Sequence, residues 1–223
     1  MASNQIDIFD FLKDVGPTET VHPEDDAILS KIPKSAHKFD LQCLPTPFYG
    51  PLRTAKIVLL YSNPGLTEKD KESANDFFEQ QFFYKQRQGN EPLRSQIGLQ
   101  KKSWWVSRTK RICEDTDYLR TRLAVLELCP YHSIEFKNVR LVKQLPSYKV
   151  ALNWAHKELF PRARARQVVV ICLRAAKHWG LQENVGDGYL FVPKVNRSGH
   201  MLKEGRDVVI NAARQILDLR SAG

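Results

Sequence analysis

The chain has 223 residues, a formal net charge of +9 and a sequence pI of about 9.4. A hydrophobic fraction of 42% beside 26% charged residues excludes a wholly disordered chain, and the longest apolar run, residues 168–173, is far too short to span a bilayer. Residues 1–10 lack a basic start followed by an apolar stretch, so we expect no secretion signal. These properties predict a cytoplasmic protein, with a monomer favoured.

Residues 1–40 form a predicted accessory arm, and residues 41–223 form a predicted α/β domain. Within the arm, five apolar residues favour one or two amphipathic turns: Ile6, Ile8, Phe9, Phe11 and Leu12. Pro45, Pro47 and Pro51 then punctuate an extended lead-in to the domain.

Four apolar runs rich in β-branched residues predict strands at 55–61, 123–128, 167–173 and 189–195. The first and third are almost continuously hydrophobic, which is typical of strands covered on both faces. Between and after them, helical spacing predicts three helices. They span 147–160 with Ser147 as N-cap, 174–179 ending at Gly180, and 207–219.

This alternation predicts a mostly parallel sheet with helices on both faces. In such sheets ligands bind at the carboxyl ends of the strands. We therefore expect the functional site in the loops that follow the four strands, at 62–67, 129–135, 174–177 and 196–203.

The first of these loops carries Asn63-Pro64-Gly65. Pro and Gly fix a tight turn after a buried strand, and Gly65 lets a ligand approach the backbone. The Asn63 side chain offers an acceptor and two donors, enough to orient a water and contact a substrate. An ordinary strand-exit turn is the alternative.

The other loops offer His132, Arg174 and the segment 196–201. His132 can act as an acid or base near neutral pH, or it is a surface histidine beside a turn. Arg174 can anchor a phosphate or carboxylate, or it forms a salt bridge at the rim of the sheet. Residues 196–201, Asn-Arg-Ser-Gly-His-Met, suit contact with a phosphate backbone or a polar base edge, or form an ordinary turn.

Basic residues gather in two stretches, a pattern that favours a nucleic-acid partner, although many basic proteins bind no polyanion. One stretch flanks Trp104-Trp105 and the other precedes the third predicted strand. The first comprises Lys101-Lys102, Arg108, Lys110-Arg111, Arg120 and Arg122, and the second comprises Arg162, Arg164 and Arg166.

The four cysteines are scattered, without a Cys-x-x-Cys pair or the Cys/His spacing of a zinc site. They are Cys43, Cys113, Cys129 and Cys172. We expect a reduced protein that holds neither a metal nor a cofactor.

Two segments together resemble the uracil-DNA glycosylase superfamily. Pro45-Thr46-Pro47-Phe48-Tyr49-Gly50, followed by the run from Ile57 to Leu66 with its Asn-Pro-Gly, is similar to the first motif of the mismatch-specific and single-strand-selective branches. Bacterial proteins of uncharacterised function share Pro-Phe-x-Gly and Asn-Pro-Gly. The resemblance extends more loosely over about residues 44–218.

The resemblance implies a three-layer α/β/α sandwich around a four-stranded parallel sheet, and an enzyme that flips a damaged base out of DNA and hydrolyses its N-glycosidic bond. Asn63 would position the attacking water, and residues 196–200 would press on the DNA backbone and supply a donor to the leaving base. The implied catalytic residues are Asn63, His132 and His200, and the implied base- or DNA-binding residues are Ser62, Pro64, Gly65, Tyr131, Arg174, Asn196, Arg197 and Ser198.

The second motif departs from the family, which has His-Pro-Ser or Met-Pro-Ser where this chain has Asn196-Arg197-Ser198. The histidine arrives two positions later, at His200. The close cysteine pair of the iron–sulphur branches is also absent, so no cluster is expected.

Three hypotheses follow. The first is a glycosylase acting in DNA repair on uracil or another damaged base. The second is a nucleic-acid-binding module of the same fold that has lost its activity. The third is an enzyme acting on a nucleoside or nucleotide, with His132 as acid and Arg174 on a phosphate.

Overall fold

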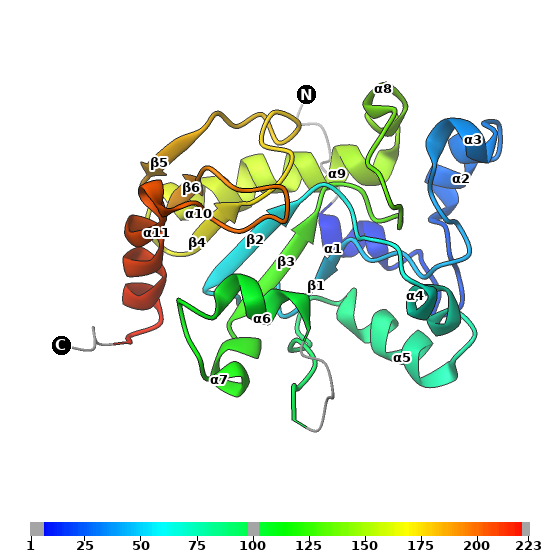
Figure 1. Ribbon diagram of the computed structural model, residues 1–223. Helices are drawn as coiled ribbons and strands as arrows, with labels where there is room; N and C mark the ends of the chain where they lie inside the picture. Colours follow the sequence, from blue (N-terminus) through cyan, green and yellow to red (C-terminus); the bar gives the residue numbers. More distant parts are fainter. Residues whose placement is uncertain (1–6, 98–102, 220–223) are drawn as a thin grey trace.

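A computed structural model describes residues 7–97 and 103–219 of the chain (Figure 1). Ile6 of the predicted amphipathic turn and Lys101-Lys102 of the first basic stretch lie outside these ranges. Within them, no helix is long and apolar enough to cross a membrane.

The described residues form a mixed α/β structure with a six-stranded sheet. Its strands are β1 (Phe48–Tyr49), β2 (Ile57–Tyr61), β3 (Leu123–Glu127), β4 (Val169–Cys172), β5 (Asn184–Asp187) and β6 (Leu190–Val192). The helices before β3 are α1 (Ile8–Leu12), α2 (Pro23–Leu29), α3 (Lys34–His37), α4 (Glu68–Ser73), α5 (Phe77–Gln86), α6 (Trp104–Thr109) and α7 (Thr116–Arg120). Those after β3 are α8 (Val139–Val142), α9 (Pro146–Trp154), the π-helix η1 (Ala155–Leu159), α10 (Phe160–Arg164) and α11 (Lys203–Ile216).

The strand order is β1-β3-β2-β4-β6-β5. The four strands expected from sequence are the four central ones, and they are parallel to one another. β1 and β5 add antiparallel edges that the sequence did not predict. β1 has only two residues, and β5 is rich in polar residues and glycine, so neither has a hydrophobic pattern long enough to detect.

Helices cover both faces of this sheet, because the strand residues alternate between two apolar clusters. Val58 and Leu60 of β2 face the cluster that contains residues of α1, α9, η1 and α10. Ile57 and Leu59 face the cluster that contains residues of α6, α7 and α11. Figure 1 shows α6, α7 and α11 in front of the sheet and α9 behind it.

The helical predictions need three corrections. Residue Ser147 lies inside α9, whose N-cap is Leu145, and the predicted helix 147–160 is a run of α9, η1 and α10. Residues 174–179 form turns rather than a helix, since Ala175 has a φ of 59°, although Gly180 does take the expected left-handed conformation. The last helix starts early, at Lys203, with a break at residues 204–205.

The N-terminal segment packs on the rest of the chain. Ile8, Phe9, Phe11 and Leu12 of α1 are all buried in the cluster that contains α9. The Asp7 side chain caps α1 by accepting a hydrogen bond from the amide of Phe9. The division into an arm and a domain stays a prediction, but the described part of the arm shares the core of the domain.

Candidate functional site

Asn63 follows β2 directly, and the surrounding loops fix its side-chain amide. Nδ2 donates to Ser133 Oγ at 2.8 Å and to Pro64 O at 2.9 Å, while Tyr131 O lies further away at 3.4 Å. Ser62 Oγ donates to Asn63 Oδ1 at 3.2 Å. An amide oxygen accepts two hydrogen bonds, so Oδ1 keeps one acceptor position for a further donor such as water. The amide is therefore oriented without any ligand.

His132 is buried at 6% exposure, and the protein engages both of its ring nitrogens. Nδ1 lies 2.6 Å from Gly65 O, which can only accept, so Nδ1 carries a proton. Asp70 Oδ2 is 3.8 Å from the same nitrogen. Nε2 lies 3.3 Å from Thr46 Oγ1. In this arrangement His132 clamps its own loop to the Asn63 loop, and neither nitrogen is free for a substrate.

The side chain of Tyr131 points into the core instead of toward the loops, with an exposure of 1%. Its hydroxyl donates to Asp25 Oδ2 at 2.6 Å and accepts from the amide of His22 at 3.3 Å. The other carboxylate oxygen of Asp25 accepts from the amide of Ser147 at 3.0 Å. The N-terminal segment thus fixes loop 129–135 through hydrogen bonds on the core side of the loop. The ring of Tyr131 is buried, so it has no exposed surface on which a base could stack.

Gly199, in the loop after β6, lies near Arg174, which follows β4, and near Arg108 of α6. A Cβ placed on it would lie 3.5 Å from Arg174 Nε and 3.6 Å from Arg108 Nε, and its φ of 80° is one that favours glycine. Arg108 donates to the carbonyl of Ser198, and Arg174 donates to the carbonyl of Arg197. This edge of the sheet therefore gathers positive charge around a small residue, as a phosphate site requires.

His200 belongs to the same cluster as these arginines. Its Nε2 lies 2.7 Å from Arg108 Nη1, so it accepts that hydrogen bond and the ring proton sits on Nδ1. Burial and the charge of Arg108 both lower the pKa of His200. Asn196 shapes the loop, because its Oδ1 accepts from the amides of Ser198 and His200 at 2.9 and 3.0 Å. His200 is thus a neutral imidazole with a donor N–H.

Glu127, which sequence reasoning missed, ends β3 beside Tyr61 of β2. Its exposure is 6%, and neither its Oε2 nor the Tyr61 hydroxyl has a hydrogen-bond partner within the described residues. Burial raises the pKa of Glu127 well above the usual range. Burial also raises the pKa of Tyr61, whose ring packs edge-on against Trp104 at 5.1 Å. The available signal was a single carboxylate inside an otherwise apolar run.

The second basic stretch of the sequence lies at the opposite edge of the sheet. Arg162, Arg164 and Arg166 precede β4, so they sit at the amino ends of the parallel strands. Arg164 there pairs with Asp187 at 2.6 Å. The cations near the candidate site are instead Arg108, Arg174 and Arg197.

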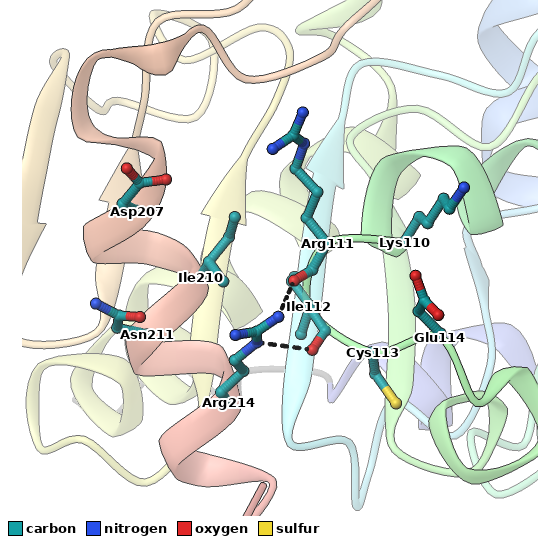
Figure 2. Close-up of a pocket in the computed structure, with 9 residues that line it drawn as sticks. All are labelled: Lys110, Arg111, Ile112, Cys113, Glu114, Asp207, Ile210, Asn211 and Arg214. Carbon is teal, nitrogen blue, oxygen red and sulfur yellow. Dashed lines mark hydrogen bonds between the residues drawn. The ribbon is translucent and has the colours of Figure 1, made fainter. Parts of the chain in front are cut away.

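The predicted site residues thus form two groups. Loops 62–67 and 129–135 bring Asn63 and His132 together, and the loops after β4 and β6 bring Arg174 and His200 together through Arg108. Two cavities lie elsewhere: one of about 560 Å³ between residues 110–114 and α11, which Figure 2 shows, and one of about 590 Å³ along α6. Within residues 7–97 and 103–219, no cluster of His, Cys, Asp and Glu is placed to hold a metal ion.

The chain matches no protein-family model, no curated protein and no solved structure.

Proposed function

We propose that this protein binds DNA at the carboxyl edge of its sheet and hydrolyses the N-glycosidic bond of uracil or another damaged base. The observation that carries the proposal is the fixed amide of Asn63 at the same edge as the arginines around Gly199. The four parallel central strands, covered on both faces, also favour the finer proposal of a glycosylase-like α/β/α sandwich.

Asn63 would orient the water that attacks the sugar. Its Nδ2 protons are used by Ser133 and Pro64, so the amide cannot rotate without losing both hydrogen bonds. The remaining acceptor position of Oδ1 is the one that a water would occupy. A water held in this way has its oxygen lone pairs directed away from the amide, toward an electrophilic sugar carbon.

His200 would stabilise the departing base. Negative charge develops on the base as the N-glycosidic bond breaks, and a pre-oriented N–H donor stabilises that charge. The neutral His200, with Nε2 occupied by Arg108, has its N–H at Nδ1. His132 would instead position Gly65 and the Asn63 loop, since its own nitrogens are engaged. Arg174 and Arg197 would contact phosphates.

Replacing Asn63 by Ala tests the catalytic part. We expect the variant to release base from uracil-, hypoxanthine- or mismatched-thymine-containing oligonucleotides about 100-fold more slowly than the wild type, because the attacking water loses its orientation. The measurement is the rate of abasic-site formation by alkaline strand cleavage. Asn75→Ala, which removes an exposed amide before α5, is the control. Absence of wild-type activity on all three substrates would contradict the proposal, as would equal rates for wild type and Asn63→Ala.

The engagement of His132 and the altered second motif favour a second candidate, a DNA-binding module without catalysis. In that case Arg174→Ala should weaken oligonucleotide binding. It should also reduce the magnitude of the slope of log affinity against log salt concentration by about 1, the value expected for the loss of one phosphate contact. Fluorescence anisotropy across a salt series measures both quantities. Arg164→Ala at the opposite edge should leave the slope unchanged. A slope lowered equally by both variants would contradict binding at the carboxyl edge.

A further inference from the structure

A groove between α11 and residues 110–114, which follow α6, has features of a ligand site that the proposed function does not use. The first cavity, about 560 Å³, is lined by residues 110–114 and by four residues of α11, which Figure 2 shows on facing sides. The second cavity, about 590 Å³, shares Lys110, Cys113 and Glu114 with it and extends along α6 to Trp104. The two cavities are therefore adjacent, and the second reaches the side chain of Trp104, which packs on Tyr61.

The walls of the groove carry cations without carboxylate partners. Lys110 and Arg111 are exposed, and neither they nor Arg214 form an ion pair with any described residue. Arg214 is held in place, because its Nε and Nη2 donate to the carbonyls of Ile112 and Arg111 at 3.3 and 2.9 Å (Figure 2). All three cationic residues line the first cavity, so its lining favours an anionic group such as a phosphate.

The rest of the lining limits the groove to one phosphate group. Ile112 and Ile210 form an apolar floor with exposures of 2% and 7%. Asn211 offers a donor and an acceptor, and the carboxylate of Glu114 would repel a second phosphate close by, while the carboxylate of Asp207 pairs with Arg206 at 3.6 Å. A volume of this size holds one nucleotide-sized group. A ligand with one phosphate, an apolar flat ring and a polar edge satisfies all of these groups.

We propose that the groove between α11 and residues 110–114 is a nucleotide-binding subsite, with the phosphate on Lys110 and Arg111 and the base over Ile112 and Ile210 beside Asn211. The same chemistry is presented by a free nucleoside monophosphate and by one unit of a DNA strand that extends from the Asn63 site. If the ligand is a unit of a DNA strand, the inference rests on the proposed function. If the ligand is a free nucleoside monophosphate, the inference is independent of that function.

Binding measurements with two probes test the subsite. The probes are thymidine monophosphate, followed by calorimetry, and fluorescent oligothymidylate, followed by anisotropy. Lys110→Ala/Arg111→Ala should weaken binding roughly tenfold or more, because charge-assisted hydrogen bonds to the phosphate are lost. Lys143→Ala/Lys149→Ala removes the same charge from exposed positions, one directly after α8 and one in α9, at the other face of the sheet, and should change affinity far less.

The two probes distinguish the source of the ligand. Groove-dependent binding of the monophosphate supports a free nucleotide site, and groove-dependent binding of the oligonucleotide alone supports a strand subsite. No wild-type binding of either probe overturns the subsite, and so does equal weakening by both double variants. Uracil excision by the wild type, measured in parallel, separates the two proposals. If Lys110→Ala/Arg111→Ala weakens binding and the wild type excises no uracil, the subsite is retained and the glycosylase proposal is overturned. If the wild type excises uracil, Asn63→Ala slows that excision, and Lys110→Ala/Arg111→Ala leaves binding unchanged, the glycosylase proposal is retained and the subsite is overturned.

A second readout needs no substitution. Cys113 lines both cavities and is the one cysteine of the four that is not buried. A saturating concentration of the probe that binds should slow alkylation of Cys113 severalfold, because the ligand would cover the thiol. An alkylation rate unchanged by the bound probe would place that ligand outside the groove and overturn the assignment.

Discussion

Replacing Asp25 by Ala is expected to lower the free energy of unfolding by about 3 kcal/mol, the largest loss that we predict for a single side chain of this protein. Asp25 is fully buried, and its two oxygens accept from the Tyr131 hydroxyl at 2.6 Å and from the amide of Ser147 at 3.0 Å. The substitution leaves both donors buried without an acceptor. Urea unfolding of the variant, followed by circular dichroism, measures the loss.

Asp26→Ala is the matched control, since Asp26 carries the same charge one position along α2 and is exposed. We expect it to change stability by less than about 0.5 kcal/mol. A double-mutant cycle with Tyr131→Phe then isolates the buried hydrogen bond. Because the two side chains share one contact, the double variant should lose less than the sum of the single losses. Additive losses, or equal effects of the two Asp substitutions, would show that the hydrogen bond between Asp25 and Tyr131 does not stabilise the packing of α2 on loop 129–135.

Replacing Glu127 by Gln is expected to make the protein more stable, relative to the wild type, as the pH rises. Burial raises the pKa of Glu127 in the folded chain, so the folded state binds its proton more tightly than the unfolded state does. The wild type therefore loses stability above the unfolded pKa of about 4.3, by up to about 1.4 kcal/mol per pH unit, until the folded pKa is passed. Gln has nearly the same shape and does not titrate.

The measurement is the difference in free energy of unfolding between Glu127→Gln and the wild type at about pH 5, 6 and 7. The difference should grow in favour of the variant at each step. Glu158→Gln, at an exposed position of η1, corrects for the general effect of removing a carboxylate. A difference that stays constant over this range would show that Glu127 is not held protonated by folding.

The sequence by itself determined the centre of the fold. The first and third predicted strands are almost continuous apolar runs, which are typical of parallel strands covered on both faces, and the two other runs alternate with helices along the chain. Because strand direction fixes where each loop emerges, the pattern also placed Asn63, His132, Arg174 and His200 at one edge. Edge strands such as β1 could not be predicted, since two residues carry no periodicity.

The tertiary structure alone decided what those side chains can do. Whether a histidine is free depends on neighbours distant in sequence, and Gly65 and Thr46 occupy both nitrogens of His132. Asp25 and Tyr131, 106 residues apart, meet because α2 packs against loop 129–135. Glu127 acquires its raised pKa only through burial beside Tyr61. Hydrogen-bond partners and solvent exclusion are properties of packing in three dimensions, so a local sequence pattern does not contain them.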